Sequence, residues 1–331
     1  MEFIMDTLKN GKCGEFVDWL DVDGNIINAS DGGMIFDGGK YYWYGQAMRD
    51  RGFGTKGEGG QVTDRGVVMY SSENLVDWRY EGVILAVNRD EDSPLCAPMR
   101  LERPKILYND KTKKYVLWCH YIKCPGDHSF FEGGGEAGVA VADKVTGPYT
   151  FLGTNRPIDN GGMVRDCTLY KDSDGTAYFI YDRDETFDLA TRCIHAVKLS
   201  EDYLSTTSEY VRIGSAYRRE APAVIKRDGY YYMITSDMTA WEANKAKYFR
   251  AKSILGEWED MGDPYTDDTA GNSFMSQTTY AFRIEGKDEY VHMAERHNKE
   301  NFLHCSYVWL PIKFDGAGKL YIDYLEEFKP F

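Results

Sequence analysis

The sequence predicts an all-β fold, a five-bladed β-propeller, and two repeated patterns lead to that prediction. The first is a polar residue, an apolar strand, a turn and an aromatic strand, and it occurs five times in the 331 residues. The second is an alternating strand followed by a turn and a Trp or Tyr, and it lies between copies of the first. Two such hairpins supply the four strands of one propeller blade, so five copies predict five blades.

Each copy of the first pattern begins with a polar residue, which we call its leader. A leader stands about twelve positions before a matching tyrosine, and the copies recur about every sixty residues, as in propellers and related arrays. The five leaders are Asp31, Glu102, Asp166, Glu220 and Gln277. In chain order, the first hairpins are expected at 31–45, 102–120, 166–182, 219–236 and 277–295, and the second at 66–82, 137–153, 194–210, 247–262 and from Cys305 onward.

Turn and loop residues agree with this division. Tight hairpins need residues that accept a positive φ, and glycine follows aspartate or glutamate at the expected turns, as in Asp37-Gly38-Gly39 and Asp228-Gly229. Glycine-rich stretches at 52–60 and 133–138 interrupt the repeats, and we expect them to form loops at one end of the blades, where binding loops are usually carried. We predict a single catalytic domain over 1–331, with 1–25 as an N-terminal capping segment.

Composition excludes several classes of protein. Hydrophobic residues make up 43% of the chain, and its 25 Tyr and 16 Phe favour strands over helices. A formal charge of −14 argues against a nucleic-acid partner, because a phosphate backbone requires a basic surface. The seven cysteines are odd in number and lack the spacing of metal ligands, so we expect reduced thiols and no zinc site.

The N-terminal region carries no apolar signal segment, and no stretch approaches the ~20 apolar residues of a membrane span. From the sequence as written we therefore expect a cytoplasmic protein that does not contact a membrane. A signal peptide removed ahead of this sequence would instead indicate a secreted or periplasmic protein.

The leaders indicate a chemistry. Equivalent hairpins place them together near the propeller axis, and crowding of carboxylates raises the pKa of some of them, as an acid catalyst at neutral pH requires. Two carboxyl groups held across a sugar ring are the machinery of glycoside hydrolysis: one donates a proton to the leaving oxygen and the other activates water or attacks carbon. A propeller whose axial acids bind a metal or satisfy backbone donors is the alternative.

Three motifs resemble those of glycoside hydrolase family 43, a family of inverting five-bladed propellers, and the resemblance extends from about Asn28 to Trp309. They are Asp31 ahead of a Tyr-Tyr strand, Arg165-Asp166 ahead of Asp172-Ser173-Asp174-Gly175, and Glu220-Ala221-Pro222 ahead of Gly229-Tyr230-Tyr231. The resemblance implies that Asp31 is the general base, that Asp166 tunes and orients the acid, and that Glu220 is the general acid.

Further motifs look most like the branch of this family that contains exo-β-1,3-galactanases: Glu102-Arg103-Pro104-Lys105, Arg165-Asp166, Arg219-Glu220-Ala221-Pro222 and Ser276-Gln277-Thr278-Thr279. That branch generally lacks the first-blade Asp, and a glutamine matching Gln277 has been assigned the water-activating role. This chain differs at Ser30-Asp31-Gly32-Gly33, where His-Gly-Gly-Gly is usual, and at Gln46, where Glu is common. We take Asp31 as the base, because a carboxylate accepts a proton from water better than an amide does, with Gln277 as the alternative.

Other polar and aromatic residues complete the predicted site. Glu102 either contacts a sugar hydroxyl or pairs with Arg103 or Arg165, and the two arginines hold the carboxylates ionised and oriented. Trp241 could stack on a pyranose ring, and Arg296 could reach the rim of the site. The predicted substrate-binding set is thus Glu102, Arg103, Arg165, Gln277, Trp241 and Arg296. We interpret His120, His128 and His297 as surface or core residues, because they lack the spacing of metal ligands.

The sequence therefore predicts an inverting, exo-acting glycosidase for a β-linked galactan or related plant-type oligosaccharide, similar to a β-1,3-galactosidase. Three alternatives stay open: an arabinofuranosidase or xylosidase of the same family, a retaining fructan hydrolase, and a non-catalytic glycan-binding propeller. The expected partner is the saccharide substrate, and no oligomeric state follows. We expect no cofactor and no metal site, although the resemblance implies a structural calcium ion in some members.

Overall fold

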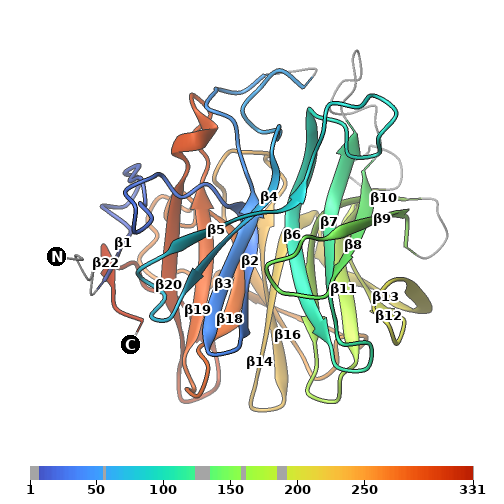
Figure 1. Cartoon of the computed structure of the whole chain (residues 1–331). Helices are drawn as coiled ribbons and strands as arrows, with labels where there is room; N and C mark the ends of the chain where they lie inside the picture. The colour runs from blue at the N-terminus through green and yellow to red at the C-terminus, as the bar shows by residue number, and fades with distance from the viewer. Residues whose placement is uncertain (1–6, 55–56, 124–134, 158–161, 185–191, 331) are drawn as a thin grey trace.

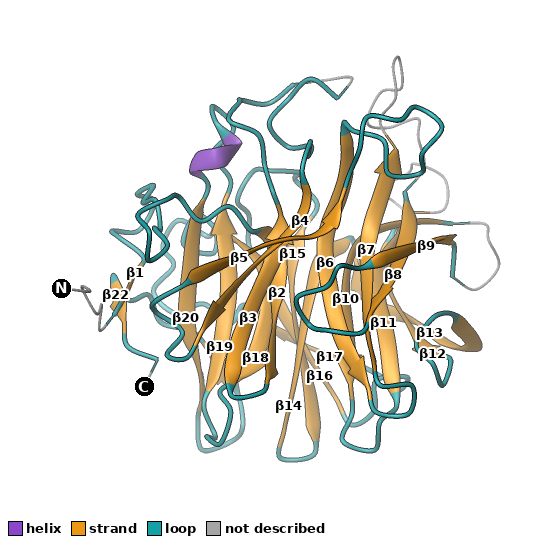
Figure 2. Cartoon of the chain, viewed as in Figure 1, coloured by secondary structure: helices purple, strands orange, loops and turns teal. Residues whose placement is uncertain are grey.

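The computed structural model describes residues 7–54, 57–123, 135–157, 162–184 and 192–330 (Figure 1). Regular structure in these ranges is almost entirely β-strand, joined by turns and loops, with one short 3-10 helix, η1 (Phe302–His304) (Figure 2). None of the helical structure in the described ranges is long and apolar enough to cross a membrane.

Five four-stranded antiparallel sheets make up the body of the protein, and each consists of four strands that are consecutive in the chain. Blade 1 contains β2 (Ser30–Asp37), β3 (Lys40–Gln46), β4 (Gly66–Ser72) and β5 (Arg79–Ala86), and blade 2 contains β6 (Met99–Asn109), β7 (Lys114–Lys123), β8 (Glu136–Ala142) and β9 (Thr150–Asn155). Blade 3 contains β10 (Met163–Lys171), β11 (Ala177–Asp184), β12 (Cys193–Leu199) and β13 (Thr206–Tyr217), and blade 4 contains β14 (Arg219–Arg227), β15 (Tyr230–Asp237), β16 (Lys247–Ala251) and β17 (Glu259–Gly262). Blade 5 contains β18 (Gln277–Arg283), β19 (Tyr290–Arg296), β20 (Ser306–Phe314) and β21 (Leu320–Tyr321).

The first strands of the blades form a ring. Strand β2 lies beside β6, β6 beside β10, β10 beside β14, β14 beside β18, and β18 beside β2. Since each of these strands contacts the first strand of both neighbouring blades, all five line one axis. The five-bladed β-propeller predicted from the sequence is confirmed.

Burial follows position within a blade. Strand β7 is buried at nearly every residue, because neighbouring blades cover both of its faces. In the outermost strand β9, exposed and half-buried residues alternate, as expected for a strand with one face toward solvent. Blades 1 and 5 are joined by an aromatic cluster in which the Trp43 and Trp309 ring centroids lie 4.9 Å apart and Trp19 lies 5.3 Å from Trp309.

Segments from the two ends of the chain meet at blade 5. Strand β1 (Leu8–Lys9), within the predicted capping segment, pairs with β22 (Glu327–Phe328), so the ends lie close together (Figure 1). Asn10 is fully buried beside this pair. Its Nδ2 donates to the backbone oxygens of Trp309 and Leu325, both at 2.9 Å, and its Oδ1 accepts from the Trp309 amide at 3.0 Å. These bonds attach the N-terminal segment to the last blade.

Candidate active site

Every inner strand is irregular near its N-terminal end. The pairing of β2 with β3 shifts between Ser30 and Gly33, and equivalent shifts occur in the other four blades. These are β-bulges, which leave extra residues on one strand and re-aim its side chains. Three bulge residues, Asp31, Arg103 and Ala221, have a positive φ of 56°, 50° and 55°. A non-glycine residue in that region costs free energy, so the surrounding contacts must hold it there.

The bulges correct one expectation. If the strands are aligned on the first residue after each bulge, Glu102, Glu220 and Gln277 are equivalent, but Asp31 is one position later and Asp166 two positions later. The leaders therefore do not share a single register. In a regular strand a shift of one residue turns a side chain to the opposite face, and the bulge is what permits Asp31 to join the others.

Arg103 is the centre of the site. Its Nε lies 2.9 Å from Asp166 Oδ2, and its Nη2 donates to Gln277 Oε1 at 2.8 Å. The same Nη2 lies 3.6 Å from Asp31 Oδ1, and Nη1 donates to the Thr278 carbonyl at 2.9 Å. One buried guanidinium thus connects leaders from blades 1, 3 and 5. The prediction that Arg103 orients carboxylates agrees with these contacts.

Glu220 is buried on the other side of Gln277. Its Oε1 accepts from Gln277 Nε2 at 3.2 Å, and the same Nε2 also donates to Ser236 Oγ at 2.8 Å. The guanidinium Nη2 of Arg192 lies 3.5 Å from Glu220 Oε2. Burial, and then the negative charge of Asp166, raise the pKa of Glu220 well above its usual range. A raised pKa favours the protonated form of the carboxyl group, which is the form that a general acid donates from.

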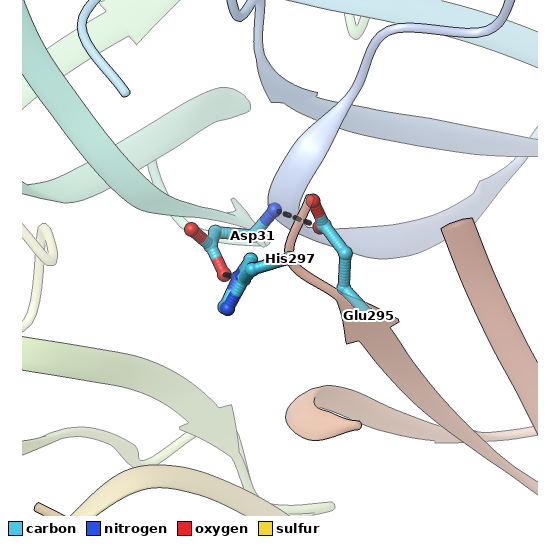
Figure 3. Close-up of side chains that lie close together, drawn as sticks. All are labelled: Asp31, Glu295 and His297. Atoms are coloured by element: carbon cyan, nitrogen blue, oxygen red, sulfur yellow. Dashed lines mark hydrogen bonds and ion pairs between the residues drawn. The ribbon is translucent and has the colours of Figure 1, made fainter. Parts of the chain in front are cut away.

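Asp31 is held through its backbone as well as its side chain. Its amide donates to Glu295 Oε2 at 3.0 Å (Figure 3), and Glu295 Oε1 accepts from Ser30 Oγ at 2.7 Å. Lys105 Nζ donates to the Asp31 carbonyl at 3.0 Å. His297 Nε2 lies 3.6 Å from Asp31 Oδ1, the oxygen that also faces Arg103. Residues from blades 1, 2 and 5 therefore fix the positive-φ backbone of Asp31.

The charges around Asp31 keep it ionised. Burial alone would raise its pKa, but the positive charges of Arg103 and His297 hold the pKa of the Asp31 carboxyl well below its usual range. Burial and the nearby Asp31 raise the pKa of Glu295. The pKa of His297 is raised, because Asp31 and Glu295 outweigh the opposing effect of burial. Asp31 and Glu220 thus have opposite tendencies: one loses its proton readily and the other retains it.

Sequence reasoning missed Glu295 and His297, and it interpreted His297 as a surface or core residue. The signal available was pairing: Glu295 stands opposite the leader Gln277 in the blade 5 hairpin, and His297 follows two residues later. The ligand atoms of Asp31, Glu295 and His297 lie within 4.8 Å of one another, a spacing that would suit a metal ion. Asp31 Oδ1 and His297 Nε2 lie 3.6 Å apart as an ion pair, and Arg103 Nη2 lies 3.6 Å from the same oxygen, so a cation bound by these two atoms would replace the pairing between them. Both oxygens of Glu295 already accept hydrogen bonds.

Glu102 pairs with residues other than those expected. Its Oε2 lies 3.0 Å from His120 Nδ1 and its Oε1 lies 3.2 Å from Arg100 Nη1, whereas the sequence suggested Arg103 or Arg165 as ion-pair partners. Burial opposes ionisation, but Arg100 and His120 lower the pKa of Glu102. His120 is therefore a neighbour of a leader rather than an ordinary core histidine, while His128 lies outside the described residues.

Aromatic side chains from three blades meet beside Glu102. The Arg100 guanidinium lies 5.0 Å from the ring centroid of Trp241, and Trp241 also contacts Phe53 at 5.3 Å and Phe302 at 6.0 Å. This position is compatible with the predicted sugar contact of Trp241, which stays a prediction.

The two remaining arginines of the predicted set lie in different surroundings. Arg165 is half-buried on β10, next to the leader Asp166. Arg296 is buried where the N-terminal segment meets blade 5. Its guanidinium donates to the carbonyls of Phe274, Asn10 and Glu15 and to the Tyr324 hydroxyl. These partners indicate that Arg296 helps to attach the N-terminal segment to blade 5 rather than contacting the substrate.

Comparison with known proteins identifies the family of this chain. The model of glycosyl hydrolases family 43 matches residues 25–315. A solved family 43 β-1,3-galactosidase with galactodeoxynojirimycin superposes with a TM-score of 0.87 and 32% identity, covering 97% of this chain and 100% of that one. An exo-β-1,3-galactanase from Clostridium thermocellum gives a TM-score of 0.80 and 31% identity, covering 98% of this chain and 67% of that one.

A xylan 1,3-β-xylosidase from a Vibrio species is 24% identical over 205 residues, which is 59% of this chain but only 36% of that relative's length. The family match extends over most of the propeller, including every leader and both residues that the sequence reasoning missed. The sequence-based prediction of family and fold is thereby confirmed. The chain belongs to glycosyl hydrolases family 43.

Proposed function

We propose that this protein is an inverting glycosidase that removes galactose from the end of a β-1,3-linked galactan or related oligosaccharide. One observation carries the proposal: buried Asp31 and Glu220 lie on two sides of the Arg103–Gln277 contact and have opposite protonation tendencies. A proton donor and an ionised acceptor at one site are what inverting hydrolysis requires.

In the proposed reaction, Glu220 donates its proton to the glycosidic oxygen as the bond from that oxygen to the anomeric carbon breaks. Asp31 accepts a proton from a water molecule, whose oxygen forms the new bond to the anomeric carbon from the opposite face. The products are a sugar of inverted configuration and a shortened saccharide, with Asp31 protonated and Glu220 ionised until both exchange protons with solvent. Asp166 orients Arg103 and, through its charge, favours the protonated form of Glu220.

Asp31 is a better base than Gln277 on the available contacts. The Gln277 oxygen already accepts from Arg103, and its nitrogen donates to Glu220 and Ser236, so its amide serves as a spacer between acid and guanidinium. Asp31 Oδ1 forms no hydrogen bond among the described residues. A carboxylate oxygen accepts a proton from water better than an amide oxygen does.

The galactan specificity rests on two relatives described as a β-1,3-galactosidase and an exo-β-1,3-galactanase, each aligned with nearly all of this chain. The Vibrio xylosidase supports a xylosidase only weakly, because its match is shorter and less identical. No step of this reaction is assigned to a metal. If a cation binds, Asp31 and His297 would be its ligands, and it would supply positive charge beside the base.

The proposal is tested with wild type, Glu220→Gln and Asp31→Asn on β-1,3-galactobiose and on arabinan and xylan oligosaccharides. We expect galactose release by wild type and a loss of at least about 100-fold in both variants. Proton NMR of the first product should show the α-anomer, which is the inverted configuration. Equal and negligible turnover by wild type and Glu220→Gln on every substrate would contradict an enzymatic role.

Gln277→Ala, assayed beside them, separates the two candidate bases. Unchanged turnover in Asp31→Asn, with loss in a Gln277→Ala variant, would assign the water to Gln277. Initial release of the β-anomer would indicate a retaining mechanism instead.

A further inference from the structure

Glu220 has a second set of neighbours, in blade 3, that the reaction above does not use. Asp182 lies on β11 with a side chain that is 0% exposed, and Arg192 lies just before β12. Arg192 Nη2 forms an ion pair with Asp182 Oδ2 and lies 3.5 Å from Glu220 Oε2. One guanidinium nitrogen is therefore shared between a buried carboxylate and the proposed acid.

This arrangement needs an explanation, because a positive charge beside a carboxyl group favours loss of its proton. A general acid has to retain its proton until substrate binds. Asp182 offsets the charge of Arg192, since the two form a close pair of net zero charge beside Glu220. After proton transfer the situation reverses: Glu220 becomes an anion, and Arg192 is already within reach of it.

We propose that Asp182 and Arg192 are positioning residues that set the proton-donating strength of Glu220. Asp182 holds the guanidinium while Glu220 is protonated, and Arg192 stabilises the Glu220 carboxylate that forms as the glycosidic bond breaks. The inference rests on the proposed role of Glu220 as general acid, and it assigns a function to an ion pair of blade 3 that does not belong to the repeated leaders.

The other groups that face Glu220 come from every neighbouring blade element. Asp166 on β10 and Asp182 on β11 favour the protonated form of Glu220. Two positive charges oppose it: Arg192, just before β12, and Arg103 on β6. Gln277 on β18 donates to Glu220 Oε1. Burial raises the pKa of Asp182 to about 6 despite the adjacent Arg192, so Asp182 is ionised at neutral pH and begins to lose its charge only in mildly acid solution.

The two residues predict effects of opposite sign on the same observable. In the pH profile of kcat/KM, the alkaline limb reports loss of the proton from Glu220 in free enzyme. Asp182→Asn removes a negative charge, lowers the pKa of Glu220 and should move that limb to lower pH by about one unit. Arg192→Met removes a positive charge, raises the pKa of Glu220 and should move the limb to higher pH.

Leaving-group dependence provides the second readout. β-1,3-Galactobiose needs a proton on its departing sugar, whereas 2,4-dinitrophenyl β-galactoside does not. We expect Arg192→Met to lower kcat for galactobiose by about 10- to 100-fold and for the dinitrophenyl substrate by less than about threefold, because only the first depends on the acid. Arg192→Lys, which retains the charge, should recover part of the loss. Lys198→Met, which removes a half-buried cation on β12 that pairs with Glu209, is the matched control and should behave as wild type.

The outcomes separate this inference from the proposed function. If wild type hydrolyses galactobiose, Glu220→Gln does not, and both blade 3 variants keep the wild-type alkaline limb, the inference is wrong and the acid assignment stands. If Glu220→Gln is as active as wild type, the acid assignment itself fails. Equal loss on both substrates in Arg192→Met would show a merely structural role. Should Asp182→Asn fail to fold, the Arg192→Lys and Arg192→Met pair still decides the question.

Discussion

Replacement of Lys105 by methionine tests how the catalytic base is held in place. Lys105 is 1% exposed on β6, and its Nζ donates to the carbonyls of Asp31 at 3.0 Å and Pro104 at 3.3 Å. Burial lowers the pKa of Lys105 to about 7, so part of the population is neutral at physiological pH, but either form can donate these bonds. Methionine has a similar length and no donor, and it would leave the Asp31 carbonyl without this partner.

The magnitude follows from the contacts. Asp31 keeps a φ of 56°, a conformation that costs about 1–3 kcal/mol and that its hydrogen bonds must offset. Leaving the buried Asp31 carbonyl without its donor costs about 1–3 kcal/mol, and it allows the Asp31 backbone to relax away from the water that Asp31 activates. We expect kcat in Lys105→Met to fall by about 10- to 100-fold, with KM changed by less than about threefold, because the hydrogen bond from Lys105 acts on the Asp31 backbone.

The assay is a double-mutant cycle with Asp31→Asn, using galactobiose hydrolysis as the readout. If Lys105 acts through Asp31, adding Lys105→Met to Asp31→Asn should cost little more, since the residue it positions has already lost its function. Fully additive losses would refute the reasoning, as would a wild-type kcat in Lys105→Met. Thermal unfolding of each variant separates a local effect from general destabilisation.

Three further predictions concern the attachment of the N-terminal segment, the role of Trp241 and metal dependence. Asn10→Ala removes a side chain with three buried hydrogen bonds to Trp309 and Leu325; we expect a loss of about 3 kcal/mol and a fall in Tm of about 4 °C by circular dichroism, and a fall below 1 °C would contradict this estimate. Trp241→Ala should raise KM for galactooligosaccharides about tenfold with kcat nearly unchanged, and an unaltered KM would exclude a sugar contact. Exhaustive treatment with EDTA should leave kcat/KM unchanged, whereas a loss restored by Ca²⁺ would establish a functional cation.

The blade plan could be predicted because it depends on local pattern. Alternating apolar residues, turn chemistry and a recurring leader are all encoded within each repeat, and the structure contains the five sheets they predict. Asp31, Asp166, Glu220 and Gln277 could be selected as candidates for the same reason, since each begins an inner strand or lies close to its start. A recurring position is visible in sequence even when its surroundings are not.

What could not be predicted depends on contacts between blades. Glu295 accepts a hydrogen bond from the Asp31 amide of blade 1; its pairing with Gln277 within blade 5 places it near a leader, but that pairing does not reveal the contact with blade 1. Arg296 was expected near substrate, yet the N-terminal segment surrounds its guanidinium with carbonyl oxygens. The shared register assumed for the leaders failed because bulges do not interrupt the hydrophobic alternation strongly enough to be recognised from one sequence.

The bulges also bear on how such an enzyme can acquire new chemistry. A regular inner strand offers the axis one side chain at a given height, whereas a bulged strand can offer consecutive residues, as Glu102 and Arg103 do here. Each bulged inner strand therefore has a second position, next to its leader, from which a side chain can face the axis. In this chain a carboxylate stands at Asp31 in blade 1 and an amide at Gln277 in blade 5, and both lie beside a bulge of an inner strand. A single substitution at a bulge can therefore change which chemical group faces the axis while the strand that carries it stays paired with its neighbour.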